Sequence, residues 1–224
     1  LEQWRTDLIT EPDSPAGLAL RHSHPEWIVR AFSEAIKDKA ELPLALAANN
    51  DRPTVHLAAR PGLMTRGELV EQTGGEPGKY SPYAVYLPAG DPGAIPAIQD
   101  GRAHVQDEGS QLVATALTLV PTASDTRWLD MCAGPGGKAA LLGALAAQRG
   151  AEVTAVEVTA HRAALVREAV TALPVTVMHA DGRQVGELSQ LPEASFDRVL
   201  VDAPCTGLGA LRRRPEARWR KQPA

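Results

Sequence analysis

Residues Asp130–Leu142 read DMCAGPGGKAALL, and this stretch decides the fold class that the sequence predicts. It follows the short apolar run TRWL (126–129) and continues into an Ala- and Leu-rich segment that ends at Gly150. A strand, a glycine-rich turn and a helix form the first unit of an open α/β sheet, which binds ligands at the carboxyl ends of its strands. Glycines at positions 134, 136 and 137 let the backbone approach such a ligand closely.

The residues that follow repeat this alternation of strand and helix. AEVTAVEV (151–158), VTVMHAD (175–181) and SFDRVLVDAP (195–204) are predicted strands, and TAHRAALVREAVTAL (159–173) is a predicted helix. Strands alternating with helices of about 10–15 residues indicate a parallel sheet. We therefore expect a Rossmann-like α/β domain over residues 121–224.

The residues before this domain show a different pattern. HPEWIVRAFSEAI (24–36) has its apolar residues at helical spacing, so we expect a helical linker region over residues 1–50. Strand and helix patterns then alternate from PTVHLAA (53–59) onward, and HVQDEGSQLVATALTLV (104–120) is predicted as one long helix. Residues 51–120 are therefore predicted to be a small α+β unit with its connecting helix.

The composition limits the classes of protein to which the chain can belong. The net charge is −4, and the two cysteines cannot form a disulfide framework or a four-thiolate zinc site. No apolar run approaches the length of about 20 residues that spans a bilayer. We expect a cytoplasmic, monomeric protein that has no metal site and no contact with a membrane. Because the chain starts without methionine, we also expect it to be part of a longer protein.

Three kinds of ligand are considered for the glycine-rich turn. A P-loop is excluded because Cys132 occupies the position of its first glycine and Ala139 follows the lysine. A dinucleotide fingerprint fits weakly. S-adenosylmethionine fits better, since this cofactor has no phosphates and needs only room for its methionine part. Glu157, about 20 residues beyond the turn, is then the expected partner of the ribose hydroxyls. Asp181, after the third strand, is a candidate for the adenine amino group.

A second candidate stretch is VDAPCTGLGA (201–210). Asp202 and Cys205 end the fourth strand, on the same sheet edge as the glycine turn. An acid there can hydrogen-bond a pyrimidine ring, and a thiolate can add to carbon 6 of that ring or leave it. A free cysteine has a pKa of about 8.5 and becomes reactive beside a positive charge, for which Lys138 is the candidate. Cys132 is interpreted as a small buried apolar residue.

The segment LRRRPEARWRKQ (211–222) carries six basic residues and one acid. A basic segment beside a candidate site on an otherwise acidic chain indicates phosphate binding, and RNA is the expected partner. Trp219 is interpreted either as a base-stacking residue or, more simply, as part of its own domain's packing. The predicted RNA-binding residues are Arg212, Arg213, Arg214, Arg218 and Arg220.

Together these stretches resemble the Fmu/Sun family of RNA (cytosine-5) methyltransferases, in particular its bacterial 16S rRNA methyltransferase B group. The resemblance runs through HPEWIV, AANNDRPTVHLAARPG, VQDEGSQLVA, LDMCAGPGGKAALL and FDRVLVDAPCTGLGALRRRPEARWR. It implies a Rossmann-like, S-adenosylmethionine-dependent methyltransferase domain, here C-terminally incomplete, after an RNA-recognition-like unit. It also implies that residues of the turn and of the strand ends contact the cofactor: Cys132, Ala133, Gly134, Pro135, Gly136, Gly137, Lys138, Glu157, Arg162, Asp181 and Asp202.

The resemblance also implies a reaction, methyl transfer to carbon 5 of a cytosine in RNA through a covalent cysteine adduct. The expected substrate is 16S rRNA. The alternatives are a tRNA, a catalytically silent RNA-binding module, and a DNA cytosine-5 methyltransferase that uses Cys205 as its nucleophile. In the resembled family a cysteine in a Thr-Cys motif is the nucleophile and the cysteine of DAPC releases the product.

Cys205, Asp202 and Lys138 are accordingly the expected catalytic residues, with Cys205 as the releasing thiol. The nucleophile is expected beyond Ala224. With four of seven strands, the chain by itself is expected to have an open sheet edge, to bind the cofactor poorly and to be inactive.

Overall fold

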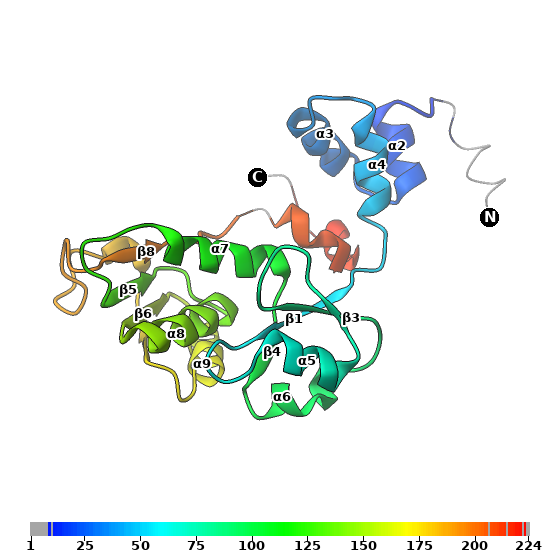
Figure 1. Ribbon diagram of the computed structural model, residues 1–224. Helices are drawn as coiled ribbons and strands as arrows, with labels where there is room; N and C mark the ends of the chain where they lie inside the picture. The colour runs from blue at the N-terminus through cyan, green and yellow to red at the C-terminus, as the bar shows by residue number, and fades with distance from the viewer. Residues whose placement is uncertain (1–8, 10, 206, 214, 221, 223–224) are drawn as a thin grey trace. The chain divides into compact units, whose positions relative to one another are not determined.

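The structure is a computed structural model that describes residues 9, 11–205, 207–213, 215–220 and 222. Residue contacts divide the chain into two units. The larger consists of residues 54–204, and the smaller consists of residues 1–53 together with residues 205–224. Figure 1 labels the elements of both units.

The first half of the larger unit is a four-stranded antiparallel sheet in the order β2-β3-β1-β4. Two helices, α5 and α6, pack on it around Leu57, Leu69 and Val85 (Figure 1). Thr65 and Glu68 form a capping box that starts α5, since each side chain accepts a hydrogen bond from the other's backbone N–H. The elements are β1 Val55–Ala59, α5 Arg66–Thr73, β2 Glu76–Pro77, β3 Ala84–Leu87, the 3₁₀ turn η1 Pro92–Ala94, α6 Pro96–Gln99 and β4 Ala103–Val105.

The second half is a parallel sheet in the order β7-β6-β5-β8. Trp128 and Val153 belong to the core that the sheet shares with α8, whereas Leu129 and Val156 pack with Leu191. The predicted alternation of strands and helices is confirmed. The elements are β5 Arg127–Asp130, α8 Gly137–Arg149, β6 Glu152–Glu157, α9 Ala160–Ala169, β7 Val175–His179, the 3₁₀ turn η2 Gly182–Gln184 and β8 Arg198–Leu200.

Helix α7, Glu108–Leu119, is attached to both sheets. At its start the buried Glu108 carboxylate accepts hydrogen bonds from Tyr80 N (2.7 Å), Ser81 N (2.9 Å) and Tyr86 Oη (2.6 Å), all beside the antiparallel sheet. At its end the Arg198 guanidinium, from β8, donates to the carbonyl oxygen of Leu117 at 2.5 Å. α7 therefore sets the position of one sheet relative to the other within this unit.

One predicted boundary is wrong. The sequence analysis expects a single helix from residue 104 to residue 120, but α7 begins at Glu108 and residues Ala103–Val105 form strand β4. β4 pairs with β1, and the side chain of Asp107 then caps α7 by accepting from Gly109 N at 3.0 Å. Strand pairing with a segment more than 40 residues away overrides the local helical pattern.

The smaller unit contains three helices, α2 Pro15–His22, α3 Glu26–Ala35 and α4 Glu41–Ala48. They pack around a cluster that includes Leu18, Val29, Leu42 and Leu46. The same unit contains the 3₁₀ segments η3 Leu208–Arg213 and η4 Pro215–Trp219. Within the described part of the chain, no helix is long and apolar enough to cross a membrane.

Candidate active site

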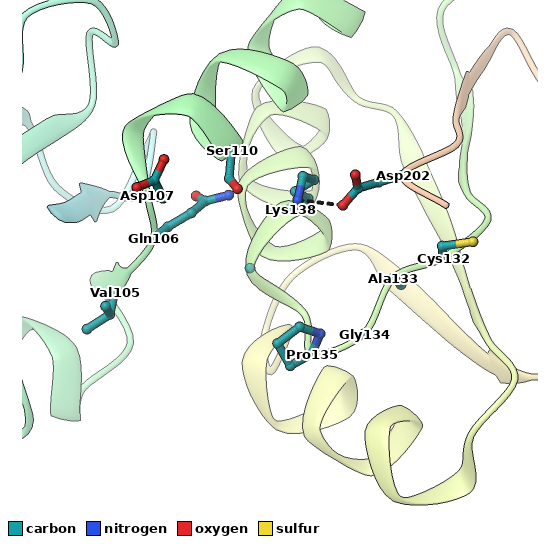
Figure 2. Close-up of a pocket in the computed structure, with 11 residues that line it drawn as sticks. Val105, Gln106, Asp107, Ser110, Cys132, Ala133, Gly134, Pro135, Lys138 and Asp202 are labelled. Carbon is teal, nitrogen blue, oxygen red and sulfur yellow. Dashed lines mark ion pairs between the residues drawn. The ribbon is translucent and has the colours of Figure 1, made fainter. Parts of the chain in front are cut away.

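A pocket of about 200 Å³ lies in the larger unit, at the carboxyl edge of the parallel sheet. The turn between β5 and α8 forms one side, and the residues just before and inside the first turn of α7 form the other (Figure 2). Asp202, which follows β8, also borders it. The lining residues are Val105, Gln106, Asp107, Ser110, Cys132, Ala133, Gly134, Pro135, Gly137, Lys138 and Asp202.

The three glycines of the turn differ in how closely the rest of the chain packs against them. A Cβ on Gly134 would lie 2.3 Å from Glu157 Oε2 and 2.8 Å from Arg162 Nε. Gly136 has a φ of +115°, and a Cβ there would lie 2.7 Å from the Cβ of Ala169. A Cβ on Gly137, in contrast, would meet only atoms of Gln106 at 3.8 Å. The first two glycines are thus required by packing against the chain itself.

Lys138 and Asp202 meet as an ion pair in the pocket. The distance from Lys138 Nζ to Asp202 Oδ2 is 2.7 Å. Figure 2 shows Gln106 and Ser110 on one side of Lys138 and Asp202 on the other. Two residues that the sequence analysis selects from separate stretches are thereby brought together. The expected role of Lys138 beside Cys205 stays a prediction, because Cys205 is an exposed residue of the smaller unit.

Glu157, at the end of β6, is buried and holds the turn. Its Oε2 accepts a hydrogen bond from Gly134 N at 3.0 Å, and its Oε1 accepts one from Thr159 N at 2.9 Å. Arg162 Nη1 lies 3.8 Å from Oε2, and the Arg162 guanidinium also donates to the carbonyl oxygen of Gly134. The structure therefore brings Glu157 and Arg162 to the turn, as neighbours of the pocket-lining backbone.

Cys132 is half-buried and lines the pocket, so it is not simply a core residue. Burial raises the pKa of its thiol, and the nearby carboxylates of Asp130, Glu157 and Asp202 raise it further. The thiol is therefore protonated at neutral pH.

Asp181 does not line this pocket. Its side chain caps η2 by accepting from Arg183 N at 3.0 Å, and it forms an ion pair with the Arg183 guanidinium at 2.5 Å. The hydrogen bond that the Arg183 guanidinium donates to Asp181 lowers the pKa of this carboxyl to about 2. Its expected contact with adenine stays a prediction.

Asp130 is a site residue that the sequence analysis misses. It ends β5, is 1% exposed, and its Oδ1 accepts from Cys132 N at 3.2 Å. Its Oδ2 is buried without a hydrogen-bond partner among the described residues. Burial raises the pKa of Asp130 to about 6, and the carboxylates of Asp202 and Glu157 add to the shift while Lys138 opposes it. The signal in the sequence is the one used for Glu157, an acid at a strand end.

Gln106, Asp107 and Ser110 are the other residues missed by the sequence analysis, which interprets VQDEGS only as the start of a helix. Gln106 is buried, and its Oε1 lies 3.0 Å from His104 Nε2. Its Nε2 has no hydrogen-bond partner among the described residues. Burial lowers the pKa of His104 to about 4, so this imidazole is neutral and donates to the Gln106 oxygen. The Gln106 amide is thereby oriented with its nitrogen available at the pocket.

The predicted RNA-binding arginines differ in exposure. Arg212, Arg213 and Arg220 are exposed. Arg218 is 2% exposed, and its guanidinium donates to Asn50 Oδ1 at 2.5 Å and to the carbonyl oxygen of Asn49. We therefore remove Arg218 from the proposed phosphate-binding set, because its charge faces the interior of the smaller unit. Arg214, also in that set, lies outside the described residues.

Comparisons with known proteins point to one family. Residues 116–224 match the family described as 16S rRNA methyltransferase RsmB/F. The chain is 59% identical over 208 residues to a putative methyltransferase of Mycobacterium tuberculosis (strain H37Rv), covering 92% of this chain and 44% of that protein. It is 36% identical over 214 residues to the probable ribosomal RNA small subunit methyltransferase B of Bacillus subtilis, covering 92% and 46%. The chain thus spans less than half of the length of these curated relatives.

Two solved structures have a similar fold. The crystal structure of PH0851 matches with a TM-score of 0.81 at 21% identity, over 93% of this chain and 48% of that one. The structure of NSun6 from Pyrococcus horikoshii with SFG matches with a TM-score of 0.65 at 16% identity, over 80% and 70%. Together with the parallel sheet, these likenesses confirm the predicted Rossmann-like α/β fold class.

Proposed function

Because residues 116–224 match the family described as 16S rRNA methyltransferase RsmB/F, we propose that the chain is part of an RNA methyltransferase that uses S-adenosylmethionine. The proposed reaction is methyl transfer to carbon 5 of a cytosine in 16S rRNA. The observation that carries this proposal is the pocket at the carboxyl edge of the parallel sheet, where the glycine-rich turn meets the Lys138–Asp202 pair.

The polar groups around the pocket fit the methionine part of this cofactor. The unpartnered Oδ2 of Asp130 suits its ammonium group, and the unpartnered Nε2 of Gln106 suits its carboxylate. A buried polar atom without a partner is costly, and a ligand that supplies the partner removes that cost. Glu157 would hold the ribose, because each oxygen of a carboxylate has a second lone pair to accept a hydroxyl hydrogen. The cofactor supplies an electrophilic methyl group.

Asp202 and Lys138 are proposed to act on the pyrimidine. The Asp202 carboxylate would accept a hydrogen bond from the amino group of the cytosine. Lys138, whose Nζ lies 2.7 Å from Asp202 Oδ2, holds that carboxylate in its orientation. Asp202 is half-exposed, so it is accessible to a base that enters from solvent. These two residues thus position the ring while a thiolate adds to carbon 6.

Cys205 is proposed to release the product and not to form the adduct. It follows Pro204, and neither cysteine of this chain follows a threonine, as the nucleophile of the resembled family does. The releasing thiol takes part after methyl transfer, when the bond between enzyme and carbon 6 breaks as the proton leaves carbon 5.

Calorimetric titration of S-adenosylmethionine into the gene-encoded protein that contains this chain tests the pocket. We expect one site, and we expect Asp130→Asn to weaken binding roughly 10- to 150-fold, because a hydrogen bond to a charged group is worth about 1.5–3 kcal/mol. Glu168→Gln, on the exposed side of α9, is the matched control and should bind like the wild type. Binding of a nicotinamide dinucleotide in place of S-adenosylmethionine would contradict the proposal.

A further inference from the structure

We propose that the smaller unit carries a stacking site for one unpaired RNA base, with Trp219 as its platform. This inference rests on the proposed function for its ligand class but concerns a different part of the chain. Trp219 lines a groove of about 350 Å³ whose opposite lining comes from helix α2, through Ala16, Ala19 and Leu20. A groove of this size falls within the range of about 300–1,000 Å³ that is typical of small-molecule sites.

The exposure of Trp219 is the first observation. Its relative exposure is 65%, whereas Trp128 in the larger unit is fully buried. Tryptophan is on average a highly buried residue, so an exposed tryptophan that lines a groove is a candidate for contact with a ligand. An indole ring can stack on any nucleobase, since every base has a π-face.

The second observation is that Trp219 is held in place by its neighbour Arg218. The Arg218 guanidinium is buried and donates to the carbonyl oxygens of Ser23 and Asn49 and to Asn50 Oδ1. These three acceptors are neutral, so none of them balances the positive charge of Arg218. Burying a charge without an opposite charge beside it costs free energy. The effect of these hydrogen bonds is to fix η4 against the end of α2 and the end of α4. Trp219, the next residue, is thereby presented beside α2.

The charges around the groove favour a base as its occupant. Glu26 lines the groove and forms an ion pair with Arg30 at 2.5 Å. Its carboxylate repels a phosphate, but it can accept a hydrogen bond from the amino group of a base. Ser23 adds a hydroxyl group to the same lining. Phosphates of the same strand are attracted by Arg212, Arg213 and Arg220, which are exposed in the same unit.

Fluorescence anisotropy with a labelled single-stranded RNA of about 12 nucleotides tests this inference on the gene-encoded protein that contains this chain. We expect Trp219→Ala to weaken binding roughly 5- to 150-fold, the equivalent of about 1–3 kcal/mol for one stacked base. Trp219→Phe should retain most of the affinity because the ring remains. Leu44→Ala, which removes another exposed apolar side chain of the same unit, is the matched control and should have no effect.

Two further ligands identify the contact. With an oligonucleotide of the same length that lacks its bases, and with duplex RNA, wild type and Trp219→Ala should bind equally. Equal binding of the two proteins to the single strand would overturn the inference, and so would an equal loss on the abasic strand or the absence of RNA binding. These results leave the proposed function standing if S-adenosylmethionine still binds the pocket of the larger unit. Loss of cofactor binding with a normal Trp219 effect would instead reject the proposed function alone.

Discussion

Asp130 and Gln106 each have a buried polar atom that no other described residue satisfies. Gln106 lines the pocket, and Asp130 accepts a hydrogen bond from the backbone N–H of Cys132, which also lines it. The sequence predicts the glycine turn, Glu157, Lys138 and Asp202, because acids and glycines at strand ends are local patterns. It does not predict which polar atoms stay without a partner, because that depends on side chains brought together from the end of β5 and from the residues just before α7. Gln106 is of this second kind, whereas Asp130 carries the same strand-end signal as Glu157.

The burial of Asp130 predicts a pH dependence of stability. Because burial raises its pKa from 3.8 to about 6, the folded protein binds more protons than the unfolded chain between these values. The stabilising contribution of the protonated group is therefore complete below pH 3.8 and is lost as the pH rises through about 6. The shift corresponds to about 3 kcal/mol. Chemical unfolding of Asp130→Asn should show a flatter profile than wild type across this window.

Glu168→Gln serves as the control for this measurement, since Glu168 is exposed on α9 of the same unit. Its profile should run parallel to that of the wild type. Parallel profiles for Asp130→Asn and wild type would show that Asp130 ionises as readily in the folded protein as in the unfolded chain.

The turn itself allows a paired test of two glycines. Gly134→Ala should destabilise the protein by about 1–3 kcal/mol, because its Cβ would collide with Glu157 Oε2 at 2.3 Å. Gly137→Ala should change stability by less than about 1 kcal/mol, since its Cβ meets only ordinary contacts at 3.8 Å. Thermal unfolding followed by circular dichroism distinguishes the two. A larger loss for Gly137→Ala than for Gly134→Ala would contradict the packing described here.

Helix α7 and strand β8 show why element boundaries were harder to predict than elements. The strands and helices from β5 to β8 follow from apolar periodicity and from the glycines that end them. The start of α7 does not, because β4 forms only by pairing with β1. The Arg198 side chain that attaches β8 to α7 was not predicted either. It joins residues about 80 positions apart, and such a contact leaves no local pattern.

The Arg198 contacts predict a large effect of one substitution. Arg198 is 5% exposed; its Nε lies 2.5 Å from Asp125 Oδ1, and its Nη1 donates to Leu117 and Val120 carbonyl oxygens. Arg198→Met should therefore lower the free energy of unfolding by about 1.5–3 kcal/mol, because the carbonyl groups of Leu117 and Val120 lose a charged donor. Asp125 keeps its contacts with Trp128 and Arg149. Urea unfolding measures this quantity.

The exposed Arg183–Asp181 pair is the matched control, since Arg183 is 90% exposed. Arg183→Met should change the free energy of unfolding by no more than about 1 kcal/mol. Similar losses for the two variants would contradict the structural role given to Arg198.

The sequence analysis divides the chain by pattern, with a boundary before residue 121, whereas residue contacts group it as residues 54–204 and the two ends. The basic segment shows the physical reason for the difference. Its charge is visible in the sequence, but Arg218 reaches Ser23 and Asn50, almost 200 and 170 positions away. Because of these long-range contacts, Arg218, which was predicted to bind RNA, is buried inside the smaller unit. These contacts also leave Trp219, next to Arg218, exposed.

The enzyme that we propose methylates cytosine in RNA and uses Cys205 for release. The most direct test incubates the gene-encoded protein with S-adenosylmethionine and small-subunit rRNA that contains 5-fluorocytosine, which blocks proton removal from carbon 5. We predict a covalent protein–RNA adduct in wild type that persists in Cys205→Ala. Loss of the adduct in Cys205→Ala would make Cys205 the nucleophile, and absence of any adduct in wild type would contradict the proposed reaction.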